Sequence, residues 1–362
     1  MKASRAAFAN VLKENNVFLG GSAIGKGFKT AAAQHLSARR AANERLLSHP
    51  DLDLDKPPVE EPFYVVDLGI VVSQVYQWRR YFPRVEPFYA VKSNPDPVII
   101  RTLATLGCHF DCASQNEMKM VHELCKELPR QPEILYANPC KPRQHLIHAI
   151  LNGVRMVTFD NVQEVQKCAS ISKKIQLVLR IVTDDRGSQC RLSSKFGAPK
   201  ARWHNLLRAA KFHGLQVVGV SFHVGSGCRD ASRYELALKD ARELFDLAKN
   251  EYGFDMNILD IGGGFPGETH SVWNPEVLDE KEEEESAGED EKEDEKEGMD
   301  SSTGGSKEGG GDDTPYMFFT EIAEAVAPLI DEMFPPNVRV IAEPGRYFVA
   351  AAATLVTAAA TK

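Results

Sequence analysis

The sequence has no run of about 18 apolar residues, the length that a membrane-spanning helix needs. Its seven cysteines are an odd number and include no Cys-x-x-Cys pair. We therefore expect reduced thiols in a cytoplasmic protein, and neither a disulfide framework, a structural zinc site nor any other metal site.

The net charge is also small outside one segment. Residues 279–313 hold 17 acidic and four basic residues, a net charge of −13, which leaves +5 on the rest of a chain whose total is −8. Neither value is typical of a nucleic-acid-binding protein. The segment is rich in Glu, Lys and Asp and then in Ser and Gly, so we expect it to be a disordered acidic insert.

The first 48 residues are rich in Ala, Ser, Arg and Lys and poor in acidic residues, a composition shared by transit peptides. The apolar residues 17–19 between Asn15-Asn16 and Gly20-Gly21 fit a short strand and turn equally well. We expect a structured N-terminal piece, with organelle targeting as the alternative.

Strand-like runs alternate with amphipathic segments along most of the chain. The runs are residues 88–91, 109–112, 134–136, 155–159, 175–181, 217–224, 258–261 and 338–342, and the helical segments are 117–127, 162–172, 201–212, 232–252 and 316–334. This alternation predicts an α/β fold with parallel strands and crossover helices. Eight strands in about 255 residues match a closed (β/α)8 TIM-like barrel, and an open doubly wound sheet is the alternative.

Two further apolar runs, residues 63–67 and 347–357, lie outside the barrel strands. We interpret them as strands of a flanking β-sheet domain that is incomplete in this sequence. The expected division is therefore an N-terminal extension with one flanking strand (1–67), a barrel that contains the acidic insert (68–346), and the start of a truncated C-terminal β domain (347–362).

The stretch Pro87-Phe88-Tyr89-Ala90-Val91-Lys92 ends an apolar, aromatic run in one lysine, and Asn94-Pro95-Asp96-Pro97 supplies a turn. This pattern predicts a buried strand with Lys92 at its carboxyl-terminal tip. An amine that is desolvated there has a lowered pKa and can form a Schiff base. Taken alone, the stretch favours a surface lysine that follows a strand.

Other strand ends also carry polar or glycine-rich groups, and a barrel would bring them to one mouth. Each has a structural explanation on its own, as an ion pair, a turn or a core histidine. Together they predict a site for pyridoxal 5′-phosphate (PLP): backbone N–H groups and an arginine for the phosphate, a lysine, a histidine and a carboxylate beside the ring nitrogen. The groups are Lys92, Asp111, Arg180, His223, Gly262-Gly263-Gly264 and Glu343-Pro344-Gly345-Arg346.

On these motifs the chain resembles the eukaryotic ornithine decarboxylases, PLP enzymes of the alanine-racemase-like fold group. The resemblance runs from about residue 63 to residue 357, apart from the acidic insert. Its matching stretches are PFYAVKSN, FDCAS, YANPCK, LVLRIVTDD, CRLSSKFG, VVGVSFHVGSGC, LDIGGGFPG and AEPGRYFVA.

The resemblance implies a role for each matching position. Lys92 would bind the cofactor covalently, and His223 would stack on its ring. The phosphate would be held by Ser226, the glycine run 262–264, Pro344-Gly345 and Arg346, and the ring nitrogen by Glu343. Asp111, Glu117 and Arg180 would form the polar network that positions the cofactor, and Lys195 would link two subunits of a homodimer.

The activity that the resemblance implies is decarboxylation of L-ornithine to putrescine, the first step of polyamine biosynthesis. Two alternatives remain open: a decarboxylase of lysine, arginine or diaminopimelate, and a non-catalytic regulator that binds antizyme. In antizyme inhibitors of this family the positions of Asp111, Arg180 and Arg346 are typically replaced, and all three are intact here. The family's C-terminal segment, with a catalytic Cys-Asp pair, has no match in these residues, so we expect a shortened chain of doubtful activity.

Overall fold

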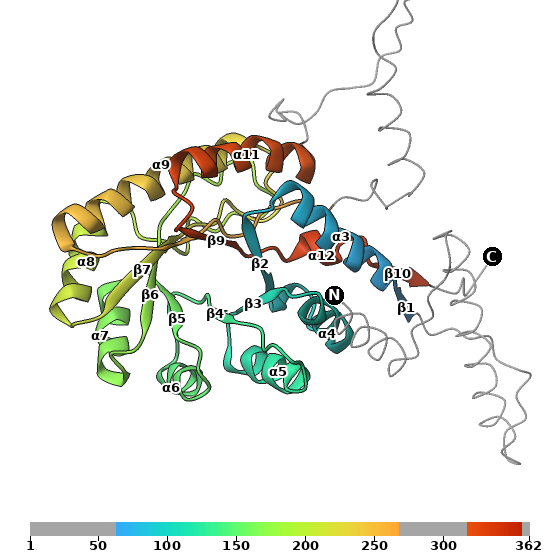
Figure 1. Cartoon of the computed structure of the whole chain (residues 1–362), viewed down its shortest axis with the longest axis horizontal. Coiled ribbons are helices and arrows are strands. Elements are labelled where there is room, and N and C mark those ends of the chain that lie inside the picture. Colours follow the sequence, from blue (N-terminus) through green and yellow to red (C-terminus); the bar gives the residue numbers. More distant parts are fainter. Residues whose placement is uncertain (1–62, 268–316, 357–362) are drawn as a thin grey trace, which may run out of the picture.

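The computed structural model describes residues 63–267 and 317–356. Eight parallel strands close into a barrel in chain order, which confirms the predicted fold class (Figure 1). The expected N-terminal piece and the acidic insert lie outside the described residues. The barrel strands are β2 (Val85–Ala90), β3 (His109–Cys112), β4 (Ile134–Tyr136), β5 (Met156–Phe159), β6 (Gln176–Arg180), β7 (Gln216–Ser221), β8 (Ile258–Asp260) and β9 (Arg339–Ala342).

Helices surround the barrel and connect its strands (Figure 1). Four of them, α3, α4, α6 and α12, were not predicted from the sequence. Sequence signals for α4 are nevertheless clear: Asp96 caps it by accepting from the amides of Val98 and Ile99, and Pro97 occupies its first position. The helices are α3 (Leu68–Tyr81), α4 (Pro97–Thr105), α5 (Gln115–Cys125), α6 (Arg143–Leu151), α7 (Val162–Ile171), α8 (Trp203–Phe212), α9 (Ala231–Leu247), α11 (Phe319–Met333) and α12 (Arg346–Val349), with short turns η1 (Val91–Ser93), η2 (Lys200–Arg202) and η3 (Ala248–Tyr252).

The core has two layers, because successive side chains of a strand point to opposite faces. Phe88, Leu135, Val178 and Ile341 belong to a small cluster inside the barrel. The larger cluster, between strands and helices, includes Tyr89 from the same strand as Phe88. Alternate residues of one apolar run therefore serve both layers, as in other barrels of this type.

A two-stranded antiparallel sheet lies beside the barrel, next to α3 and α12 (Figure 1). It pairs β1 (Phe63–Val66) with β10 (Ala353–Val356), and Tyr64 lies opposite Leu355. The predicted strand at 347–357 was wrong over its first part, where α12 forms. An apolar run without a clear period fits either structure, and here Tyr347 and Phe348 pack against Trp78 of α3.

Within the described ranges no helix is long and apolar enough to cross a membrane. The seven cysteines are all free.

Candidate active site

A cavity of about 510 Å³ opens at the carboxyl-terminal end of the barrel strands. It brings together seven of the predicted site residues, from the segments that follow β2, β7, β8 and β9: Lys92, His223, Ser226, Gly264, Glu343, Gly345 and Arg346. The other seven lining residues were not predicted: Ala90, Ser93, Asn94, Leu192, Phe265, Val349 and Ala350. A smaller cavity of about 200 Å³, beside Cys108 and Pro129, contains none of the predicted residues.

Lys92 lies just past the end of β2, in the turn η1, rather than at the strand tip itself. Its Nζ is 2.6 Å from Oδ2 of Asp111, a fully buried carboxylate on β3. Half of the Lys92 side-chain surface is open, and the residue lines the cavity. The amine is thus held at the wall of the cavity by one charge-assisted hydrogen bond.

The predicted lowering of the Lys92 pKa was wrong for this state of the site. Burial lowers the pKa of the amine, as expected, but the charges of Asp111 and Glu343 raise it by more, so that it lies above its usual value. Arg180 opposes them only in part. The amine is therefore a protonated ammonium at neutral pH, and it must lose a proton before it can act as a nucleophile.

Glu343 faces a second buried carboxyl group, Asp260, which sequence reasoning did not assign to the site. Burial, Asp260 and Asp111 hold the pKa of Glu343 well above its usual value, and burial is the main cause that raises the pKa of Asp260 to about 6. Oδ1 of Asp260 accepts from the Gly262 amide at 2.9 Å. Oδ2 of Asp260 accepts no hydrogen bond in the described part of the chain. A proton shared between the two carboxyl groups would give Oδ2 a hydrogen bond and remove one of the two negative charges.

His223 is held neutral in this site. Its Nδ1 accepts a hydrogen bond from the Gly225 amide at 3.0 Å, which places the ring proton on Nε2. Burial, Arg180 and Lys92 together hold the pKa of the imidazole well below its usual value. The ring lies against Gly263, where an added Cβ would come within 2.9 Å of Nε2. The chain thus offers an uncharged aromatic face at the wall of the cavity.

The glycine run after β8 keeps backbone amides accessible. Gly264 has φ +112°, and a Cβ there would lie 2.6 Å from the carbonyl oxygen of Gly225, so only glycine fits. Its carbonyl accepts from the Cys228 amide at 2.9 Å. Among the described residues, the amides of Gly263 and Gly264 have no acceptor. Such amides, with Arg346 across the cavity, suit an anion.

Arg180 and Glu117 occupy different surroundings from those of the cavity residues. Arg180 ends β6, is buried, and lies over the ring of Phe196 at 5.1 Å. Glu117 accepts from the Ala113 amide at 2.6 Å and donates its own amide to Ser114, which caps α5. Glu117 therefore anchors the end of the segment that follows Asp111, and its carboxylate makes no direct contact with Lys92.

The three remaining predicted residues are close to the cavity or exposed. Gly262 accepts from the Glu343 amide at 2.6 Å, and Pro344 accepts from the Ala90 amide at 3.1 Å, so both tie neighbouring strand ends together. Lys195 is exposed in the loop that follows β6.

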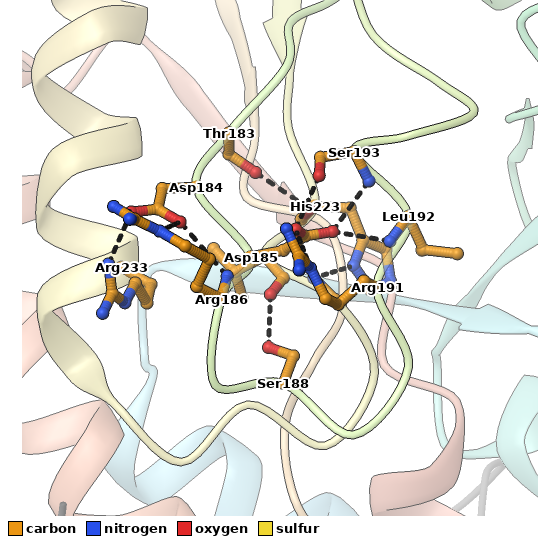
Figure 2. Close-up of polar contacts among 12 residues, drawn as sticks. Thr183, Asp184, Asp185, Arg186, Ser188, Arg191, Leu192, Ser193, His223 and Arg233 are labelled. Atoms are coloured by element: carbon orange, nitrogen blue, oxygen red, sulfur yellow. Dashed lines mark hydrogen bonds and ion pairs between the residues drawn. The ribbon is translucent and has the colours of Figure 1, made fainter. Parts of the chain in front are cut away.

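Residues 183–193 of that loop dock on the segment that carries His223 (Figure 2). Thr183 donates to the His223 carbonyl at 3.0 Å, and Ser188 donates to the Val224 carbonyl at 2.6 Å. At one edge Asp184 pairs with Arg233 of α9 at 2.6 Å. These contacts place Leu192 in the cavity wall, a role that the sequence did not reveal.

Asp185 is the buried anchor of this loop (Figure 2). It accepts from the amides of Leu192 and Ser193 at 2.6 and 2.7 Å and from the Ser193 hydroxyl at 2.6 Å. Arg191 adds an ion pair at 3.2 Å. Burial raises the pKa of Asp185, but these hydrogen bonds lower it by more, so the carboxyl stays ionised and the loop stays closed on itself.

Residues 68–287 match the pyridoxal-binding domain of the pyridoxal-dependent decarboxylases. The chain belongs to this family. The ornithine decarboxylase of Mus musculus is 42% identical over 298 residues, which are 82% of this chain and 54% of that protein. Antizyme inhibitor 2 of Xenopus laevis is 40% identical over 297 residues, 82% of this chain and 55% of that protein.

Among solved structures, the arginine decarboxylase of Paramecium bursaria Chlorella virus matches with a TM-score of 0.65 and 31% identity, over 87% of this chain and 70% of that one. The fold is therefore that of known pyridoxal-dependent decarboxylases. The chain spans about half the length of the curated relatives it matches.

PLP is the cofactor of this family's pyridoxal-binding domain, and the described residues fit it. The cavity is lined by a lysine, by an arginine and by Glu343, which is one member of the buried acid pair. Free glycine amides and the unpartnered Oδ1 of buried Asp111 leave polar groups for a ligand to satisfy. In the described residues no group of three His, Cys, Asp or Glu side chains could hold a metal ion.

Proposed function

We propose that this protein decarboxylates L-ornithine to putrescine with PLP as cofactor. The observation that carries the proposal is that Lys92, Glu343 and Arg346 line a single cavity at the carboxyl-terminal mouth of the barrel. These are the three groups that PLP requires at its aldehyde, ring nitrogen and phosphate. The 42% identity to the ornithine decarboxylase of Mus musculus supports ornithine as substrate.

Each part of the cavity would hold one part of the cofactor. Lys92 would bind it covalently, His223 would cover one ring face, and Glu343 would face the ring nitrogen. Ser226, the glycine amides of 263–264, Gly345 and Arg346 would hold the phosphate. When bound, PLP supplies an electron sink for the charge left on the substrate's α-carbon as carbon dioxide leaves.

The chain's own residues would bind and transfer the protons that the reaction requires. Asp111 is the nearest acceptor for the proton that the Lys92 ammonium must lose, at 2.6 Å. The Glu343–Asp260 pair binds a proton at neutral pH because burial and mutual repulsion disfavour two charges. With PLP bound, that proton would be available to the ring nitrogen. Neutral His223 adds no positive charge against the ring.

The test measures carbon dioxide released from carboxyl-labelled ornithine, lysine and arginine, with PLP added. We expect release to be fastest from ornithine and abolished by Lys92→Ala. The control is Lys239→Ala, which removes an exposed lysine of α9. Faster release of carbon dioxide from lysine or arginine would show that this amino acid, and not ornithine, is the preferred substrate.

A second candidate function is a regulator that binds antizyme, and the 40% identity to Xenopus antizyme inhibitor 2 favours it. The joint placement of Lys92, Asp111 and Arg346 around one cavity supports the enzyme instead. Capture of antizyme by the chain, together with no carbon dioxide release from any of the three amino acids, would establish the regulator.

The homodimer, in which Lys195 would lie near the partner, and the cytoplasmic location remain predictions. Light scattering after size-exclusion chromatography tests the dimer, and a mass of one chain would contradict it.

A further inference from the structure

Arg346, at the edge of the cavity, has a partner that sequence reasoning did not anticipate. Its Nη1 donates to Oε1 of Gln189, which lies in the docked loop. Within the described ranges this is the one hydrogen bond made by the Arg346 guanidinium. Gln189 also lies directly over Gly227, because a Cβ on Gly227 would come 2.6 Å from the same Oε1.

The backbone holds Gln189 in this place. The next residue, Cys190, exchanges two hydrogen bonds with Ser226, at 3.0 and 2.9 Å, in an isolated antiparallel bridge. Asp185 anchors the loop a few residues earlier. Gln189 therefore lies between a fixed backbone and the group that would bind the cofactor phosphate.

We propose that Gln189 is a positioning residue of the phosphate site: its amide oxygen orients the Arg346 guanidinium toward the phosphate of PLP. The inference rests on the proposed function. Arginine has five N–H donors in a fixed plane, so one hydrogen bond to Gln189 sets the orientation of that plane and leaves donors for two phosphate oxygens. A long arginine side chain that is already oriented loses less conformational freedom when the anion binds.

The experiment compares the binding of PLP and of pyridoxal, which lacks the phosphate, to the full chain. Absorbance titration gives an apparent Kd for each ligand. Gln189→Met keeps the length of the side chain and removes the acceptor, and Gln189→Glu replaces the amide with a charge. Ser194→Ala, at an exposed position of the same loop segment, is the matched control.

We expect Gln189→Met to weaken the binding of PLP by about three- to tenfold, the usual effect of one lost hydrogen bond. Gln189→Glu should weaken PLP binding further, by about tenfold or more. Its carboxylate competes with the phosphate for Arg346 and repels the phosphate. Pyridoxal binding should stay unchanged in both variants, and Ser194→Ala should bind both ligands as the parent chain does.

Two results would overturn the inference. Unchanged PLP binding in Gln189→Met would show that the hydrogen bond does not matter to the phosphate. Equal weakening of PLP and pyridoxal would show that Gln189 supports the loop in general. A different result concerns the proposed function itself: a parent chain that binds PLP no more tightly than pyridoxal has no phosphate site, and both proposals would fall.

Discussion

The ion pair between Lys92 and Asp111 controls the protonation of the amine that the proposed reaction uses, and Asp111→Asn tests it. The substitution keeps the shape of the side chain and removes its charge. At 2.6 Å, with the screening of water, the pair is worth about 1.6 kcal/mol. The screened value applies because half of the Lys92 side-chain surface is open. Loss of this attraction should lower the pKa of Lys92.

The direction follows from the charges that remain. Without Asp111, burial and Arg180 still lower the pKa of Lys92, and Glu343 alone still raises it. In the parent chain the folded pKa lies above the unfolded value of 10.5. The stabilisation from Lys92 is therefore fully present below pH 10.5 and is lost as the pH rises through the folded pKa.

The assay is reductive methylation of the amine with formaldehyde and a mild hydride donor, followed by mass spectrometry of the peptide that contains Lys92. The rate rises with pH as the amine deprotonates, and the curve of Asp111→Asn should move to lower pH. Asp331→Asn, which removes an exposed carboxylate paired with Arg84, is the control and should not move it. A curve that stays in place or moves to higher pH would refute the reasoning.

Three further substitutions, with Phe212→Ala as a control, test the packing and the acid pair by urea unfolding. Asp260→Asn should stabilise the protein, because burial raises the pKa of Asp260 from 3.8 to about 6 and so makes its charge unfavourable in the folded state. The gain should build up as the pH rises from 3.8 to about 6 and stay constant above it. A loss at neutral pH would contradict the acid pair. Phe265→Ala, which removes a ring 5.1 Å from those of both Trp78 and Tyr234, should cost about 3–5 kcal/mol. The exposed Phe212→Ala should change stability by less than about 0.5 kcal/mol. Gly219→Ala places a Cβ 2.2 Å from the Ile258 carbonyl oxygen and should lower the free energy of unfolding by about 1–3 kcal/mol. If Phe265→Ala or Gly219→Ala were as stable as the parent chain, the packing described for that residue would be refuted.

The barrel could be predicted because each strand is a short apolar run that ends in a polar or glycine-rich group. The strands at His109–Cys112 and Ile134–Tyr136 have the predicted bounds. Helix α6 was missed because its apolar residues lack strong periodicity. Helix α3 was missed although its buried residues Leu68, Val71, Val75 and Trp78 recur at helical spacing. The apolar run after Gly345 was taken for a strand throughout. The parallel order then places the strand ends together, which is why seven predicted residues share one cavity.

The finer features of the site depend on contacts that sequence spacing does not show. The pKa of Lys92 depends on Asp111, from another strand, and on Glu343, from the far end of the chain. Gln189 gives no motif signal, because its role arises from how a loop docks. For Glu117 a signal was present: Ser114 followed three residues later by glutamate is typical of a helix start, and the structure places Glu117 there.

The most direct test of the central claim is to add PLP to the full chain, reduce with borohydride, and map the modified lysine by mass spectrometry. Borohydride makes a lysine–PLP linkage permanent, so the modified peptide identifies the residue that binds the cofactor. We predict one modified lysine, Lys92, with Arg346→Ala greatly reducing the yield. Modification of other lysines instead, or none at all, would contradict the assignment of this cavity as the cofactor site.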